Sequence, residues 1–173
     1  MVREYTVQKS LKDAYPYVPK MVALCTDESV IGADFYVMER MEGIIPRANL
    51  PKGIDLDVEQ TRALCTNVID ALVDLHQVDY KEHPDLVNLG RGEGYCERQV
   101  TGWDKRYIKA ETPNVPSFGL VRPWLSTHTP ADSKTCLIHN DWRFDNVILD
   151  AADPTKVIGV LDWEMATLGD PLM

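Results

Sequence analysis

Two short apolar segments near the carboxyl terminus constrain the fold more than any other feature of the sequence. They cover residues 147–149 and 157–161 and flank the turn segment DAADPTK. Runs of β-branched residues on both sides of a polar turn predict an antiparallel hairpin. In such a hairpin the residue before the first strand, Asn146, lies beside the residue after the second strand, Asp162.

This hairpin predicts a cation site. Neighbouring strands lie about 4.8 Å apart, a distance that oxygen-bearing side chains can span to share one hard cation. An amide oxygen and a carboxylate, completed by water and phosphate oxygens, are typical ligands of Mg²⁺. Asn146 and Asp162 are thus the candidate metal ligands. A bound cation also explains a carboxylate directly after an apolar strand, where an unpaired charge is costly.

Asp141 belongs to the same region, in the segment LIHNDWRFDN that ends at Asn146. Its spacing from Asn146 places it near the metal without making it a ligand, so that it can accept a proton from an attacking hydroxyl. This combination indicates phosphoryl transfer. Two alternatives stay open. Asp141 and Asn146 can be turn or cap residues, and Cys136, His139 and Asp141 can bind zinc, although no fourth ligand accompanies them.

The charge balance excludes some classes of partner. The chain of 173 residues has a formal net charge of -9 at pH 7. It offers no basic surface to a phosphate backbone, so we expect neither nucleic acid nor membrane as a partner, whereas a neutral or cationic small molecule is compatible. No apolar run approaches the roughly 20 residues that cross a bilayer, and the start MVREYTVQKS lacks a signal-peptide core. We therefore expect a cytoplasmic protein.

The remaining pattern predicts an α+β fold. Apolar residues at helical spacing occur in four segments, residues 3–14, 57–76, 95–109 and 120–125. The segments MVALC and DFYVMER predict a pair of antiparallel strands, and CLIH predicts a further strand. Asp57 and Gln60 have capping-box spacing at the start of the second helix. His76, at its end, is expected to act as a partial cation.

The motif HNDWRFDN, followed by LDWE and LGDP, resembles the aminoglycoside phosphotransferase family, whose members have a protein-kinase-like fold. The segments FYVMERMEG, LHQVD and GYCERQVTGW also fall in the order found in the kinase-like domain of acyl-CoA dehydrogenase fusion proteins. The resemblance implies a partial protein-kinase-like fold. Residues 1–41 would be a remnant of the N-terminal nucleotide-binding lobe and hinge, and residues 42–173 a helical C-terminal catalytic lobe with its β-hairpin, incomplete at its C-terminus.

The resemblance also implies roles in the catalytic lobe. Asp141 would be the catalytic base, and His139 would brace the loop that carries it. Asn146 and Asp162 would hold Mg²⁺. Asn140 occupies a position that is usually Gly in the family. The implied activity is ATP- and Mg²⁺-dependent transfer of a phosphoryl group to a hydroxyl of a small molecule, such as an aminoglycoside or a hydroxylated acyl compound.

The implied nucleotide site lies in the N-terminal part. The backbone groups of Glu39, Arg40 and Met41 would bond the adenine of ATP, and Glu4 would pair with a strand lysine that contacts the α- and β-phosphates. These residues count as cofactor-binding together with the two Mg²⁺ ligands. The local sequence pattern alone indicates only that residues 39–41 are the end of a strand.

The sequence departs from the family at both ends. No lysine and no G-x-G-x-x-G motif precede Glu4, and the chain stops at LGDPLM, where family members continue into further helices. We therefore expect a chain truncated at both ends, with exposed apolar surface that can support self-association. The alternative to an active kinase is a catalytically inactive homologue or fragment that serves as a nucleotide-binding or interaction module.

Overall fold

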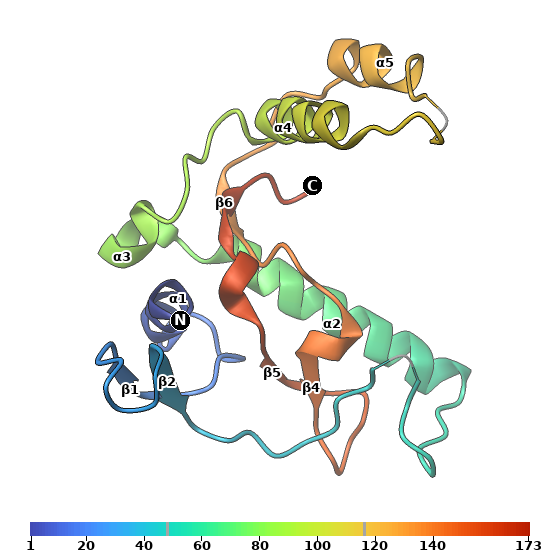
Figure 1. Ribbon diagram of the computed structural model, residues 1–173. Coiled ribbons are helices and arrows are strands. Elements are labelled where there is room, and N and C mark those ends of the chain that lie inside the picture. The colour runs from blue at the N-terminus through green and yellow to red at the C-terminus, as the bar shows by residue number, and fades with distance from the viewer. Residues whose placement is uncertain (48, 116) are drawn as a thin grey trace.

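The computed structural model describes residues 1–47, 49–115 and 117–173 (Figure 1). In this part of the chain, three two-stranded antiparallel sheets and the helices around them form the predicted α+β fold. The long helix α2 crosses the middle of the molecule, α1 lies beside the N-terminal strands, and α4 and α5 stand apart from the rest. The elements that carry the candidate site therefore lie between the N-terminal strands and the α4–α5 pair.

The N-terminal part consists of one helix and one hairpin. Its elements are α1 (Val2–Leu11), β1 (Met21–Cys25) and β2 (Phe35–Met38). The two strands are antiparallel, with Cys25 opposite Phe35, which confirms the predicted pair. α1 packs against both strands and buries Val7 and Leu11 completely. Glu4 lies on the same buried face, so its carboxylate points into the protein.

Helix α2 (Val58–Gln77) is the predicted amphipathic helix. The carboxylate of Asp57 accepts the backbone N–H of Gln60 at 2.8 Å, and the Gln60 side chain accepts the N–H of Asp57 at 3.0 Å. This reciprocal capping box satisfies two amides that have no partner within the helix. The face that α2 buries, Leu64, Val68, Ala71 and Leu75, packs in the main hydrophobic core.

The C-terminal part contains two strand pairs and several short helices. The strands are β3 (Cys136–Ile138), β4 (Val147–Leu149), β5 (Val157–Val160) and β6 (Thr167–Gly169). The short helices are η1 (Tyr80–Glu82), α3 (Pro84–Val87), η2 (Phe144–Asn146) and η3 (Trp163–Met165). β4 and β5 form the predicted hairpin. β6 was not among the predicted strands, because three residues that end in Gly carry almost no strand signal.

The hairpin β4–β5 is joined to the N-terminal part by backbone hydrogen bonds. Ile44 and Leu149 exchange two of them, each 2.8 Å long. The N–H of Val160 donates to the carbonyl oxygen of Tyr17 at 2.7 Å. Trp163, directly after the hairpin, is completely buried, and its ring packs edge-on against Tyr15. These contacts hold the hairpin and the N-terminal part in one core.

Helices α4 (Tyr95–Ala110) and α5 (Val121–Thr127) pack against each other. Pro123 does not shorten α5 to the predicted residue 125, because it lies in the first turn, where a missing N–H leaves no helical bond unmade. Large apolar side chains on this pair are exposed, among them Trp103, Leu120 and Trp124. A mainly apolar cavity of about 330 Å³ lies between the helices. No helix of the described residues is long and apolar enough to span a membrane.

The prediction that His76 is a partial cation is wrong. Burial lowers the pKa of His76, and the nearby Lys134 ammonium lowers it further. The same ammonium donates a hydrogen bond of 3.2 Å to the carbonyl oxygen of His76. Lys134 therefore provides the positive charge at the C-terminus of α2, and the imidazole is neutral at pH 7.

The depressed pKa of His76 makes the stability of the fold depend on pH. Between the folded pKa and the ordinary value of about 6.5, the unfolded chain binds more protons than the folded chain. The stabilising contribution is therefore complete above about pH 6.5 and is lost as the pH falls through the folded pKa. We expect Lys134→Met to raise the pKa of His76 in an NMR titration of the imidazole and to reduce the loss of unfolding free energy on acidification.

Lys52→Met, in an exposed loop, is the matched control and should leave the titration of His76 unchanged. An unchanged His76 pKa in Lys134→Met would contradict the assigned influence of the ammonium.

Candidate active site

His139 follows β3 and is completely buried. Its Nε2 lies 2.9 Å from the carbonyl oxygen of Leu161, at the end of β5. Its ring packs edge-on against Trp142 and Trp163, with centroid distances of 5.6 and 4.9 Å. This imidazole thus ties the loop after β3 to the strand that precedes Asp162.

The contacts of His139 define its protonation state. Burial lowers the pKa of His139, against the opposing effects of the Leu161 carbonyl and the Asp141 carboxylate. Since the carbonyl oxygen can only accept, Nε2 carries the proton and donates it to Leu161. Nδ1 is then free to accept the backbone N–H of Asp141, 3.3 Å away. The neutral imidazole therefore holds both ends of the site.

Asp141 and Asn146 are in direct contact. The Asn146 amide nitrogen donates to the Asp141 carboxylate and to the Asp141 carbonyl oxygen, each at 3.0 Å. Asn146 is buried, whereas Asp141 is half-buried and still reaches solvent. Because Nδ2 is engaged with Asp141, the amide oxygen Oδ1 is the atom with which Asn146 can bind a cation.

Asp162 lies beside Asn146, as the predicted hairpin requires. The N–H of Leu161 donates to the carbonyl oxygen of Asn146 at 2.8 Å, and Val147 is opposite Val160. Asp162 is exposed at the end of this pairing. An amide oxygen and an accessible carboxylate on adjacent backbones match the hard oxygen ligands of Mg²⁺. The donor set therefore fits this ion.

Two residues of the site have a left-handed backbone. Asp162 has φ 64° and Asn140 has φ 69°, and the other described residue with positive φ that is not Gly is Arg47. Asn and Asp tolerate this conformation better than other residues with a side chain, but it still requires support from the surroundings. Left-handed residues other than Gly are found mainly at functional sites. The loop after β3 and the end of β5 are therefore candidates for function.

Glu4 has a different partner from the lysine that the resemblance implies. Burial raises the pKa of Tyr36 to about 12, and a hydrogen bond to the Glu4 carboxylate raises it as well. The Tyr36 hydroxyl, on β2, therefore stays protonated and is a neutral neighbour of Glu4, and it accepts a hydrogen bond of 3.5 Å from the Gln8 side chain. Among the described residues, the ion pairs are Arg122 with Asp104 and Arg143 with Asp145, so Glu4 belongs to neither. The charge of Asp162 also raises the pKa of Tyr36.

The predicted hinge follows β2. The N–H of Glu39 donates to the carbonyl oxygen of Lys20 at 2.8 Å and is therefore not available to adenine. Glu39 and Arg40 are exposed, and Met41 is half-buried. The Met41 side chain lies against Gly159 of β5, where an added Cβ would come within 2.7 Å of its sulfur. The hinge segment thus runs along the same hairpin that carries Asn146 and Asp162.

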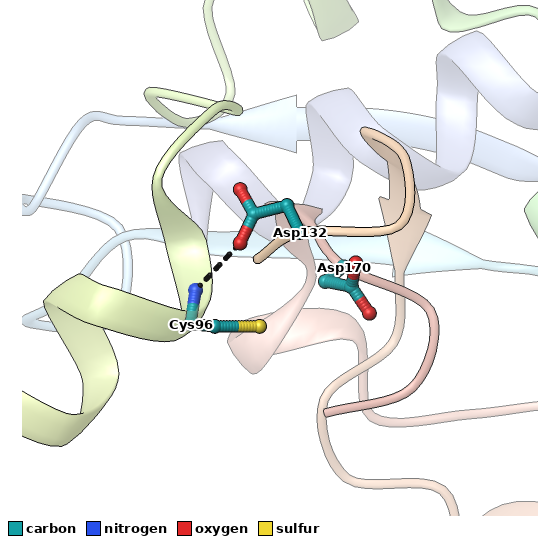
Figure 2. Close-up of side chains that lie close together, drawn as sticks. All are labelled: Cys96, Asp132 and Asp170. Carbon is teal, nitrogen blue, oxygen red and sulfur yellow. Dashed lines mark hydrogen bonds between the residues drawn. The ribbon is translucent and has the colours of Figure 1, made fainter. Parts of the chain in front are cut away.

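A second cluster of possible metal ligands was not predicted from the sequence. The ligand atoms of Cys96, Asp132 and Asp170 all lie within 4.8 Å of one another (Figure 2). This is the only such group of three among the described His, Cys, Asp and Glu side chains, so Cys136, His139 and Asp141 do not form the alternative zinc site.

The carboxylates of this cluster already have partners. Asp132 accepts the backbone N–H groups of Tyr95 at 2.8 Å and Cys96 at 2.9 Å, and these bonds hold the pKa of Asp132 below its usual range. Burial alone would raise the pKa of Asp170, but hydrogen bonds from Leu172 and Ser133 outweigh it and lower the pKa. The cluster is therefore a backbone anchor, in which Asp170 joins Ser133 and Leu172.

Comparison with known proteins gives one family over the whole chain. The family model described as "Phosphotransferase enzyme family" matches residues 1–173. Acyl-CoA dehydrogenase family member 11 of Gallus gallus is 40% identical over 172 residues, which cover 98% of this chain and 21% of that protein. Acyl-CoA dehydrogenase family member 10 of Mus musculus is 38% identical over 170 residues, which cover 98% of this chain and 15% of that protein.

Solved structures have the same fold. A putative aminoglycoside phosphotransferase from Ralstonia eutropha JMP134 aligns with a TM-score of 0.86 and 35% identity, covering 98% of this chain and 51% of that chain. A GDP complex of an aminoglycoside 2′-phosphotransferase aligns with a TM-score of 0.73 at 16% identity, over 98% of this chain and 56% of that one, and shows the fold alone. The chain thus has part of a kinase-like fold and spans about half the length of these structures.

Replacement of His139 tests its role as a brace. We expect His139→Ala to lower the free energy of unfolding by about 3 kcal/mol, because it removes a buried ring and leaves the Leu161 carbonyl oxygen without its donor. His139→Gln, whose amide can still donate to that oxygen, should cost clearly less. Urea denaturation of both variants measures the difference. Equal losses would mean that ring packing alone, and not the hydrogen bond, joins the loop to β5.

Proposed function

The chain belongs to the phosphotransferase enzyme family, and from this premise we propose that it transfers the γ-phosphoryl group of ATP to a hydroxyl of a small molecule in a Mg²⁺-dependent reaction. The observation that carries the proposal is the contact of the Asp141 carboxylate with the Asn146 amide at 3.0 Å, beside Asp162. A base next to a pair of hard oxygen ligands is the arrangement that phosphoryl transfer requires.

In the proposed mechanism, Asp141 accepts the proton of the acceptor hydroxyl as its oxygen forms a bond to the γ-phosphorus. The bond from that phosphorus to the bridging oxygen of ADP breaks, and ADP leaves. Asn146 orients the base through its Nδ2–H, and its Oδ1 and the Asp162 carboxylate would hold Mg²⁺, which neutralises charge on the phosphate oxygens when bound. His139 keeps the base and Asp162 at a fixed separation through its contacts to both segments.

The nucleotide would lie between the N-terminal part and the β4–β5 hairpin. We assign the adenine contacts to the backbone of residues 39–41, excluding the N–H of Glu39, which bonds Lys20. Structures of family relatives with bound GDP or ADP support nucleotide use by this fold. Glu4 would contribute by pairing with a lysine that replaces the Tyr36 hydroxyl as its partner.

The acceptor class follows from charge and from the relatives. A net charge of -9 favours a neutral or cationic acceptor over nucleic acid or an anionic membrane. The similarity to a putative aminoglycoside phosphotransferase supports an aminoglycoside, and the similarity to acyl-CoA dehydrogenase family members supports a hydroxylated acyl compound.

We place this activity in the cytoplasm. The exposed apolar side chains of α4 and α5 support self-association as a further property.

One observation favours a second function. The buried Glu4 carboxylate already has the neutral Tyr36 hydroxyl as its neighbour in place of a lysine, and such an arrangement suits a chain that binds nucleotide or a partner without turnover. This module would bind Mg²⁺-ATP weakly or not at all and would transfer no phosphoryl group to any acceptor.

Removal of the candidate base should separate chemistry from binding. We expect Asp141→Asn to lower phosphoryl transfer to an aminoglycoside or hydroxyacyl acceptor by about 10²- to 10⁴-fold, because the amide cannot take the proton. Binding of ATP should stay within about twofold, since the contact with Asn146 can be kept. The matched control Asp145→Asn, in the same loop, should retain transfer. Parallel loss of binding and transfer in Asp141→Asn would exclude Asp141 as the base.

Calorimetry with Mg²⁺-ATP tests the metal ligands. We expect Asp162→Asn to weaken binding by about tenfold or more, because an amide replaces the one negatively charged ligand. Asp153→Asn, in the exposed turn of the same hairpin, is the matched control and should bind like the unchanged chain. If both variants bind alike, Asp162 is not a Mg²⁺ ligand. A folded chain that binds no Mg²⁺-ATP would contradict the catalytic proposal for residues 1–173.

A further inference from the structure

The backbone of Asn140 determines where Asp141 points. Asn140 stands between the buried brace His139 and the candidate base and has φ 69°. Asn140 is exposed, so packing in the core does not hold its backbone in this conformation. A left-handed residue costs roughly 1–2 kcal/mol when it is not Gly, although Asn reduces this cost through local hydrogen bonds. The conformation therefore depends on a specific contact from the surroundings.

Tyr95 makes that contact. Its hydroxyl lies 3.2 Å from the side-chain oxygen of Asn140. Burial raises the pKa of Tyr95, so the hydroxyl is protonated at neutral pH and donates to Asn140. Tyr95 is the first residue of α4 and comes from a segment that is 45 residues earlier in the chain. The hydrogen bond thus joins α4 to the loop that carries the candidate base.

The ring of Tyr95 is itself fixed. It is 5% exposed and packs with Cys136 and Ile138 of β3. A Cβ on Gly169 of β6 would lie 3.0 Å from the Tyr95 ring and 2.7 Å from the end of Ile138. The ring therefore fills the space that the missing side chain of Gly169 leaves between the strands. Its hydroxyl is presented at the end of β3, directly beside Asn140.

The backbone of Tyr95 is held by a separate anchor. Gly94, the residue before α4, has no side chain to cap the helix. Asp132, from the segment before β3, instead accepts the N–H groups of Tyr95 and Cys96. Figure 2 shows the bond from Cys96. Asp132 thus locates the first turn of α4 relative to the segment that leads into β3. Two anchors, one for the backbone and one for the ring, leave the Tyr95 hydroxyl little freedom.

We propose that Tyr95 is a positioning residue, whose hydroxyl holds Asn140 in the left-handed conformation that aims Asp141 at the acceptor. The catalytic consequence rests on the proposed function, whereas the structural part stands on the contacts alone. Gly at position 140 would reach the same conformation without a side-chain contact. The proposal therefore makes the effect of the Tyr95 hydroxyl depend on the residue at position 140.

A double-mutant cycle tests this dependence. Tyr95→Phe keeps the buried ring and removes only the hydroxyl. We expect it to lower kcat by about tenfold, since small errors in the placement of a reacting group are costly, and to leave the KM for ATP unchanged. In the Asn140→Gly background, adding Tyr95→Phe should change kcat by less than about twofold relative to Asn140→Gly alone. Tyr107→Phe, on the same helix but about 18 Å further along it, is the matched control.

Hydrogen–deuterium exchange of residues 139–146 provides a readout that needs no turnover. Tyr95→Phe should speed exchange in this loop by several-fold in the original background and leave it unchanged in the Asn140→Gly background. This result would support the positioning role even if no acceptor is phosphorylated, in which case the proposed function fails alone. Equal effects of Tyr95→Phe in both backgrounds, or no effect on exchange or kcat in either, would overturn the proposal.

Discussion

The hydrogen bond between His139 and the carbonyl oxygen of Leu161 is the constraint on which the candidate site depends. It crosses from the loop after β3 to the end of β5, and the buried ring is enclosed by Trp142 and Trp163. Because the imidazole is neutral, the bond has no charge to desolvate. A rigid polar contact in an apolar setting therefore determines the distance between the loop of Asp141 and Asp162.

The N-terminal part shares one hydrophobic core with this centre and is also joined to it by specific polar contacts. Arg3 donates to the carbonyl oxygen of Ala166 at 2.7 Å, which places α1 against the segment after Asp162. The carboxylates of Glu4 and Asp162 both raise the pKa of Tyr36, so its hydroxyl stays protonated. Glu4, which is buried on α1, belongs to neither ion pair of the described residues and has a neutral hydroxyl as its neighbour.

The opposite side of the site is held by carboxylates that do no chemistry. Asp132 and Asp170 direct their oxygens at backbone N–H groups and thereby join α4, the segment before β3 and the C-terminal segment. Their arrangement with Cys96 has the appearance of a metal site, and the hydrogen-bond partners decide against it. Tyr95 carries the effect of this anchor to Asn140. The anchoring carboxylates and the candidate base therefore differ in what they bond, backbone N–H groups for Asp132 and the Asn146 amide for Asp141.

Local sequence patterns were sufficient to predict the helices, most strands and the order of the site residues. The capping box of Asp57, the strand pair at residues 21–38 and the β4–β5 hairpin follow from periodicity and turn chemistry, which act over a few residues. The hairpin alone placed Asn146 beside Asp162. Long-range packing determines the features that depend on distant segments: the pairing of β3 with β6, the position of Glu4 near Tyr36, and the contact of Tyr95 with Asn140. These contacts join residues that are far apart in the chain, and no local pattern encodes which buried donor meets which acceptor.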